Sequence, residues 1–252
     1  MKKRWVVVLA VVAFLVTLVL HAPAALLYAW SQDPKQPSKV RLHGVHGTLA
    51  QGGFAALSVG NRPTLREVRW TLRPAWLALL RIAADFEAGD EAVLRVRVSR
   101  SVFGALRLSG LNSAGNVKSL LQMLGQPVLP VEGQARLDLP LLRLDQGAPI
   151  EAEGSVEIEN LTWTLAREPL PLGSFNAALS TDKQGIQVSF GSGPGPLEIG
   201  GSATLGGDRS YDLDLQLRPR PEAPAQLLTL VRSLGAADAQ GWHHVRRKGT
   251  LQ

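Results

Sequence analysis

The sequence predicts a mainly β protein, in which one N-terminal transmembrane helix precedes a curled antiparallel sheet with a few short helices. The sequence does not decide whether that sheet forms a half-barrel, a groove or a sandwich. Three observations predict this fold class. A basic cluster and a long apolar run open the chain, apolar and polar residues alternate over most of the remainder, and glycine (25) and proline (16) are plentiful among 252 residues.

The N-terminal segment has the pattern of a membrane anchor. A helix over residues 4–22 would be about 28 Å long, close to the thickness of the hydrocarbon core of a bilayer. The basic end is expected to stay in the cytoplasm, so that the rest of the chain is exported into the periplasm. The residues that we expect to set the anchor and its topology are Lys2, Lys3, Arg4, Trp5, Leu20, Tyr28 and Trp30.

A cleaved signal peptide is the alternative, with Ala22-Pro23-Ala24 as the cleavage site. The apolar run is long for a signal peptide and continues past that site, which favours a retained anchor. We therefore divide the chain into a basic tip and anchor (residues 1–30), a polar linker (31–39) and a periplasmic β-rich domain (40–252). A division of that domain into two lobes near residue 125 stays open.

Period-two alternation identifies the strands. The clearest case is the segment from Tyr211 to Arg218, where Tyr and Leu alternate with Asp, Gln and Arg. Around Asn160 the apolar register slips by one residue, which predicts a β-bulge. Other alternating segments lie at residues 67–73, 94–99, 129–141 and 186–190, and turn signals lie at 87–90, 182–185 and 206–208.

Helices are expected to be few. Residues 74–81 and 117–124 are candidates for one or two turns each. The best candidate is the segment 223–234, where Leu227, Leu230, Val231 and Leu234 share one face and Gly235 ends the helix.

Composition excludes several classes of function. The chain has no cysteine, so a disulfide framework, a thiol nucleophile and a cysteine metal site are excluded. The net charge of +6 is concentrated near the two ends, and no basic face is interleaved with aromatics as nucleic-acid binding would require. The C-terminal cluster Arg246, Arg247 and Lys248 is a candidate contact for a partner or for lipid headgroups, with a solvated terminal strand as the alternative.

For each group of residues that resembles a metal, phosphate or catalytic site, a purely structural role is the better interpretation. His43 and His46 have a spacing that suits a helix better than a glycine-broken strand, and the adjacent His243 and His244 would face opposite ways. The loop 191–195 is glycine-rich but lacks the following helix that a phosphate site needs. Glu151, Glu153, Glu157 and Glu159 read as one solvated face of a strand. We therefore predict no catalytic residue, no cofactor, no metal site and no enzymatic activity.

The order of several motifs resembles the protein N family of the bacterial type II secretion system. The motifs are LHGVHGTLAQGG at residues 42–53, VRWTLRPAWLALL at 68–80, IENLTWTL at 158–165, and a C-terminal block that runs from Tyr211-Asp-Leu-Asp-Leu to Lys248-Gly249-Thr250-Leu251. The family often has a tryptophan where Ala50 and Gln51 stand. The resemblance implies a non-catalytic accessory or assembly subunit of that machinery in the bacterial inner membrane, in contact with the secretin or with inner-membrane platform proteins. The resemblance transfers no binding residue.

A second function is consistent with the same pattern. A curled sheet with an apolar inner face could bind or transfer lipid in the periplasm while anchored in the inner membrane. A filled core would favour a scaffolding subunit, whereas a continuous uncovered apolar face would favour lipid binding.

Overall fold

The computed structural model describes residues 14, 17–32, 40–59, 62–89, 92–101, 104–123, 129–164 and 168–250. The helices are α2 (Ala24–Ser31), the 3-10 helix η1 (Pro74–Leu79), α3 (Val117–Met123) and α4 (Ala225–Arg232). The strands are β1 (Val40–His43), β2 (His46–Gly47), β3 (Gln51–Val59), β4 (Arg62–Leu72), β5 (Arg81–Ala88), β6 (Ala92–Ser101), β7 (Leu106–Asn116), β8 (Val131–Asp145), β9 (Ala148–Trp163), β10 (Leu170–Asp182), β11 (Gly185–Ser192), β12 (Leu197–Leu205), β13 (Ser210–Pro219) and β14 (His243–Thr250).

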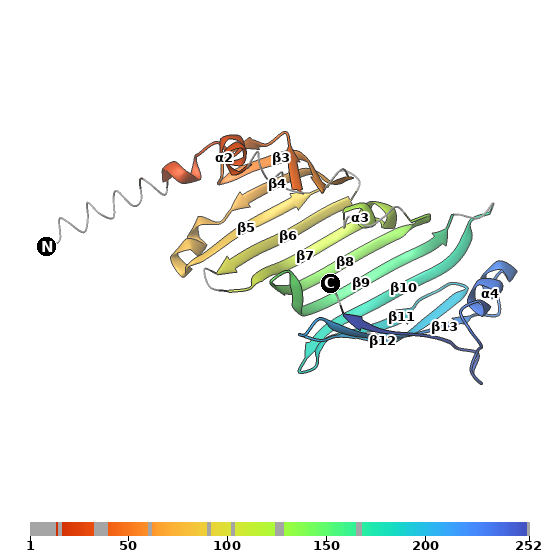
Figure 1. The fold of residues 1–252 in the computed structure, drawn as a ribbon. Helices are drawn as coiled ribbons and strands as arrows, with labels where there is room; N and C mark the ends of the chain where they lie inside the picture. The colour runs from red at the N-terminus through yellow and green to blue at the C-terminus, as the bar shows by residue number, and fades with distance from the viewer. Residues whose placement is uncertain are drawn as a thin grey trace.

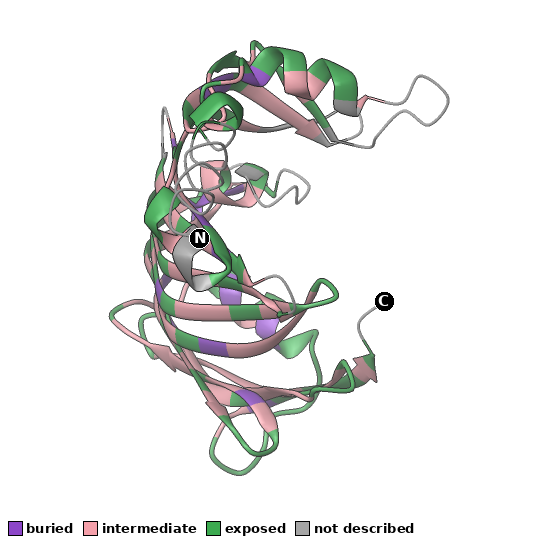
Figure 2. Ribbon diagram, turned by 90° about the vertical axis from the view of Figure 1, so that its left-hand side faces the viewer, coloured by how far each residue is buried: buried purple, intermediate pink, exposed green. Residues whose placement is uncertain are grey.

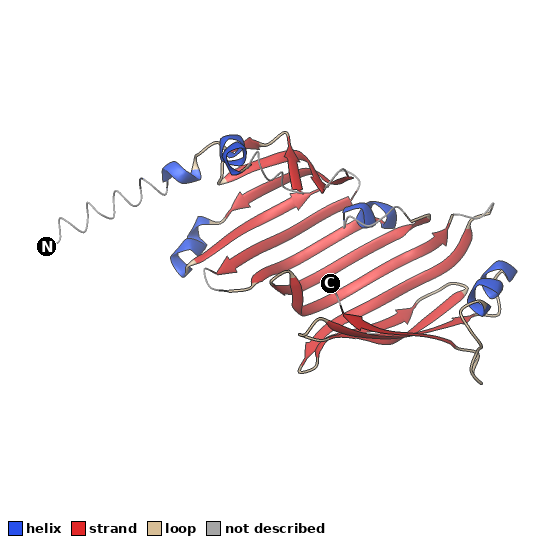
Figure 3. Ribbon diagram, in the orientation of Figure 1, coloured by secondary structure: helices blue, strands red, loops and turns tan. Residues whose placement is uncertain are grey.

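The fourteen strands in the described residues form one antiparallel sheet, so the expected mainly β fold is confirmed (Figures 1 and 3). The order in space follows the order in the chain, β1-β3-β4 and then each strand to β14, while β2 pairs with β3 beside this path. Tight turns account for much of this meander, because consecutive strands joined by such turns pair with each other. Longer connections that contain α3 and α4 precede β8 and β14. The predicted turns at 182–185 and 206–208 join β10 to β11 and β12 to β13.

In the residues that the structure describes, β14 does not pair with β1 and no second sheet forms, so the sheet is open and curved. Its strands curl into an arc in the side view of Figure 2. The two faces differ in chemistry. On one face, cross-strand neighbours are apolar in strand after strand, as in the row Phe86–Val96 and the row Leu108–Leu142–Ala152. We call this the apolar face and the opposite one the polar face.

Two small cores cover the ends of the apolar face. At the N-terminal end, Phe54, Val68 and Ala88 are buried and Trp70 lies 6.2 Å from Phe54 between ring centroids. At the C-terminal end, α4 buries Leu227 and Val231 against the sheet residues Leu170 and Leu197, with Phe175, Ile199 and Leu217 around them. Because α4 packs on this face and lies inside the arc, the apolar face is the concave one (Figures 1 and 2).

Between these cores the apolar face is only half-buried. In this middle part α3 contacts β4, β7 and β8. The half-buried side chains of the apolar face include Val96, Leu108, Val156, Ala177, Leu179, Val188, Phe190, Ala203, Leu213 and Leu215. A sheet that is hydrophobic on one side normally buries that side against another layer. In the described chain no second sheet lies over the middle of this face, so a large apolar surface remains from β9 to β13.

The register confirms the bulge that the sequence predicts near Asn160. Glu132 pairs with Thr162 and Gln134 pairs with Glu159, so β9 has one extra residue there, and Asn160 has a φ of 51°. A second slip falls in β8, where Leu141 pairs with Ser109 and Glu153 on the polar side. The expectation that apolar odd positions continue to Leu141 is thus wrong at this last residue, because Leu142 and Leu144 take over the apolar face.

The predicted short helices form, but α4 differs in one respect. Leu227 and Val231 are buried, as expected, whereas 52% of Leu230 and 46% of Leu234 remain exposed. The helix ends at Arg232 and crosses a concave sheet, so only one narrow stripe reaches the strands. The four residues that share one face in the prediction are therefore not buried alike, since Leu227 and Val231 reach the sheet and Leu230 and Leu234 do not.

The N-terminal segment is attached to the first strands by backbone hydrogen bonds. The amides of Leu49 and Ala50 donate to the carbonyl oxygens of Ala22 and Leu20 at 3.1 and 2.9 Å. The Tyr28 hydroxyl accepts a hydrogen bond of 2.8 Å from the amide of Leu42. In the part of the chain that the structure describes, no helix is both long and apolar enough to span a membrane.

Candidate functional site

The polar face has ladders of ion pairs that run from strand to strand. Asp85 on β5 accepts hydrogen bonds from Arg97 at 2.6 Å and from Arg73 at 2.7 Å. These guanidinium groups, with Arg97 as the larger influence, hold the pKa of the Asp85 carboxyl below its usual range. Asp85 is thus neutralised by Arg97 of the neighbouring strand and by Arg73 just after β4, and opposite charges on neighbouring strands stabilise a sheet. The further pairs on this face are Arg95–Glu87, Arg136–Glu157, Arg143–Glu151, Arg218–Glu198, Arg246–Asp214 and Lys248–Asp212.

The four glutamates of β9 belong to this solvated face, as the alternation predicts. Glu151 and Glu157 pair with arginines of β8 at 2.7 and 3.8 Å, and Glu153 and Glu159 are exposed. The loop 191–195 lies between β11 and β12, and the next element is a strand. Both features have structural roles, and neither brings two carboxylates or a phosphate cradle to a shared point.

The candidate histidines are separated. His43 and His46 are exposed on β1 and β2, and the His46 ring lies 3.0 Å from the carbonyl oxygen of Gly44. His243 is 5% exposed and its Nδ1 lies 2.8 Å from the carbonyl oxygen of Gly235. His244 points to the other face, where its Nε2 lies 3.0 Å from Asp238. The expectation of opposite faces for His243 and His244 agrees with these contacts.

The loop between α4 and β14 is held by contacts that the sequence pattern does not reveal. Asp238 accepts hydrogen bonds from the His244 ring and from the amides of Trp242 and Gln240, which lower the pKa of its carboxyl to about 2, the His244 contact contributing most. Arg218 lies over the Trp242 ring at 4.3 Å and also binds Glu198. No spacing rule links these residues, since strand pairing across a long loop brings them together.

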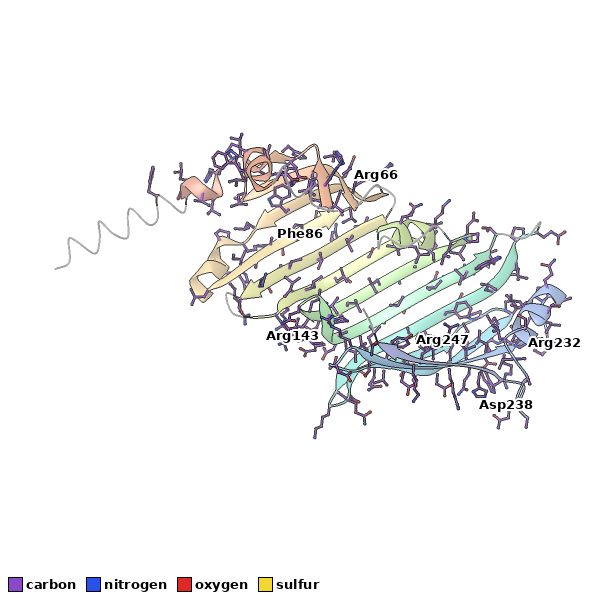
Figure 4. The ribbon with its side chains drawn as sticks, in the orientation of Figure 1. Arg66, Phe86, Arg143, Arg232, Asp238 and Arg247 are labelled. Atoms are coloured by element: carbon purple, nitrogen blue, oxygen red, sulfur yellow. The ribbon has the colours of Figure 1, made fainter. Side chains whose placement is uncertain are left out.

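The basic cluster of β14 divides between the two faces. Arg246 and Lys248 lie on the polar face and pair with Asp214 and Asp212 at 3.0 and 2.7 Å. Arg247 lies on the apolar face, directly opposite Leu213 of β13, and among the described residues no ion pair neutralises it (Figure 4). The cluster is therefore not one basic patch, and Arg247 is the member that is available to a ligand.

One hollow lies beside the end of β13. It encloses about 610 Å³ and is lined by Glu198, Arg218, Pro219, Arg220, Pro221 and Leu228. The charged groups of its wall already have partners, because Arg218 binds Glu198 and Arg220 donates to the carbonyl oxygen of Gly195 at 3.0 Å. This hollow therefore offers no free polar group that would orient a reacting substrate.

Of the expected anchor residues, Leu20, Tyr28 and Trp30 lie in described segments, whereas Lys2, Lys3, Arg4 and Trp5 lie outside them. Trp30 is 81% exposed, and Leu18, Val19 and Leu26 are each more than half exposed. These apolar side chains need an environment other than the sheet, to which only Ala24 of this segment is tightly packed. The arrangement as a whole offers surfaces for binding: an uncovered apolar face, one open strand edge and an apolar N-terminal segment.

Comparison with known proteins gives a consistent result. The family model described as "Type II secretion system (T2SS), protein N" matches residues 38–246. The chain is similar to Type II secretion system protein N of Aeromonas hydrophila, with 29% identity over 268 aligned residues that cover 99% of both chains. It is also similar to Type II secretion system protein N of Vibrio cholerae, with 26% identity over 247 residues and 93% of each chain covered. No solved structure matches the chain.

Proposed function

Since the chain belongs to the type II secretion system protein N family, we propose that it is a non-catalytic accessory subunit that helps to assemble that machinery. The N-terminal segment tethers the subunit to the inner membrane, with residues 1–30 as tip and anchor and 31–39 as linker. The β-rich domain from residue 40 onward lies in the periplasm and binds other components. Arg246, Arg247 and Lys248 lie on the strand that faces these partners.

The observation that carries this proposal is the open edge of the sheet at β14. This strand is eight residues long and, among the described strands, pairs only with β13, so alternate amides and carbonyls point away from the sheet. The opposite edge is less accessible, because β1 has four residues and β2 lies beside it on β3. An extended segment of a partner can add to β14 as a further strand, with main-chain hydrogen bonds supplying affinity.

Site-specific crosslinking in living cells tests this proposal. A photoreactive residue at Lys248, on the edge strand, is expected to capture the secretin or an inner-membrane platform protein. The matched control is the same residue at Ser189, which is exposed on the polar face but lies on β11, a strand paired on both sides. Capture from both positions alike, or from neither, would refute edge binding.

A second function, lipid binding, is favoured by a different observation. The apolar face is continuous from strand to strand, yet its middle is half-buried and uncovered. Soluble proteins rarely expose a large apolar surface unless it binds something. The two functions are compatible, because one uses the edge of the sheet and the other its concave face.

A further inference from the structure

The structure places one cation in an apolar row that crosses six strands. The row runs through cross-strand partners from Gly154 on β9 to Arg247 on β14, and its inner members are Leu179, Val188, Ala203 and Leu213. With strands about 4.8 Å apart, the row is roughly 24 Å long. The four inner side chains are half-buried, whereas Arg247 is exposed.

The row lies beyond the reach of α4. That helix packs on the opposite end of the strands, against Leu217 of β13, four residues away from Leu213. Four residues of a strand span about 14 Å. Among the described residues, the α4 core therefore does not reach this row.

Among the described residues, Arg247 has no ion-pair partner, unlike the two basic residues beside it. Its neighbours Arg246 and Lys248 are neutralised by Asp214 and Asp212 on the polar face. In the ladders of β9 to β13, the residues that share the apolar face with Arg247 are all uncharged. A guanidinium group offers five hydrogen-bond donors in a planar fork that matches a phosphate. A ligand that complements Arg247 and the row therefore carries an anionic group beside an apolar chain.

We infer that this row is the binding site of an anionic phospholipid, with acyl chains along the apolar row and the phosphate at Arg247. A peptide strand fits this place less well, because the backbone groups of the inner strands are already paired with each other and offer it no hydrogen bonds. The inference rests on the second proposed function and on the membrane tether. The N-terminal segment, which is hydrogen-bonded to the loop before β3, exposes Leu18, Val19 and Leu26. In the proposed tether these side chains lie in the bilayer, which supplies the lipid.

Crosslinking of the full chain in cells tests the face of binding. A photoreactive residue at Leu213 points into the row, and one at Asp212 lies next to it on the polar face. Mass spectrometry is expected to find phosphatidylglycerol adducts from position 213 and none above background from position 212. Equal lipid adducts from both positions, or protein adducts alone from position 213, would overturn the inference.

Charge variants test the role of Arg247. Arg247→Ala is expected to reduce the phosphatidylglycerol adducts at position 213 by about tenfold, as loss of charge-assisted hydrogen bonds implies, and Arg247→Lys to reduce them less. Arg246→Ala is the matched control, since it removes the same group from the same strand on the other face. An equal loss from both alanine variants, or no loss from Arg247→Ala, would overturn the inference. Capture of secretion components from Lys248 is scored separately, so failure of lipid binding leaves the assembly role standing.

Discussion

The guanidinium of Arg218 joins three parts of the C-terminal region. It donates two hydrogen bonds to Glu198 at 2.7 and 3.0 Å and lies 4.3 Å from the centre of the Trp242 ring. Because the side chain is partly exposed, the ion pair and the cation–π contact are each worth only up to about 1 kcal/mol. We expect Arg218→Ala to lower the free energy of unfolding by about 1 kcal/mol in urea titrations.

The control for this change is Arg95→Ala. The Arg95–Glu87 pair has a distance of 3.5 Å and both side chains are more than 60% exposed, without a ring contact. Its loss is expected to change the free energy of unfolding by less than about 0.5 kcal/mol. An equal effect of the two variants would contradict the stacking role of Trp242.

Asp238 makes the stability of the loop before β14 depend on pH. Its pKa is lowered to about 2 in the folded chain by the His244 contact and two amide hydrogen bonds. A carboxyl with a lowered folded pKa stabilises the fold above its unfolded pKa, and that stabilisation is lost as the pH falls through the folded value. The difference in free energy of unfolding between the wild type and Asp238→Asn should therefore be present at about pH 5 and vanish between about pH 4 and 2. Urea titrations across this range measure it, and a difference that stays constant down to pH 2 would disprove the assignment.

Among the elements, α4 is the one whose removal exposes most of a core. Leu227 is fully buried, whereas its neighbour Leu230 is 52% exposed on the same helix. Leu227→Ala is expected to lower the free energy of unfolding by about 3 kcal/mol, through lost burial and a cavity. Leu230→Ala is expected to cost less than about 0.5 kcal/mol by the same denaturation assay, because it leaves no cavity. Similar losses from both would mean that α4 does not pack as described.

The elements also show what the sequence could and could not predict. Alternation identified most strands and the bulge at Asn160, because side chains on a strand have a strict period of two. Glycine- and aspartate-containing turn signals identified the turns at 182–185 and 206–208. It could not assign the buried stripe of α4, since the curvature of the sheet decides which leucines reach it. Successive residues of a strand face opposite sides of the sheet, which separates His243 from His244. The same rule places Arg247 on the other face from Arg246 and Lys248, so the sequence already contained this information. The contact of Asp238 with His244 depends on a loop path that no local pattern encodes.

The whole sheet is a chain of nearest-neighbour pairings, which predicts an uneven stability. Each strand contacts mainly the strands beside it, as repeats do in a solenoid, and β8 and β9 are the longest, with 15 and 16 residues. Hydrogen exchange of the native protein is therefore expected to be slowest in β8 and β9 and fastest in β1 and β14. Uniform protection across the sheet would instead indicate a single cooperative unit.

The position of the apolar segment at one end of the sheet predicts the topology of the whole molecule. Phe14, Leu18, Val19, Leu26 and Trp30 are all more than half exposed, while backbone hydrogen bonds hold this segment to the loop before β3. Burial of such side chains in a bilayer would relieve their contact with water, and the basic cluster before them would remain in the cytoplasm.

Alkaline phosphatase fused after Gln252 should then be active and a green fluorescent protein at the same place dark. Exchange of Lys2, Lys3 and Arg4 for glutamine should reduce the phosphatase activity, because the signal that orients the segment is lost. Bright fluorescence from the unaltered chain would place the sheet in the cytosol and would remove the basis for both the membrane tether and the lipid site.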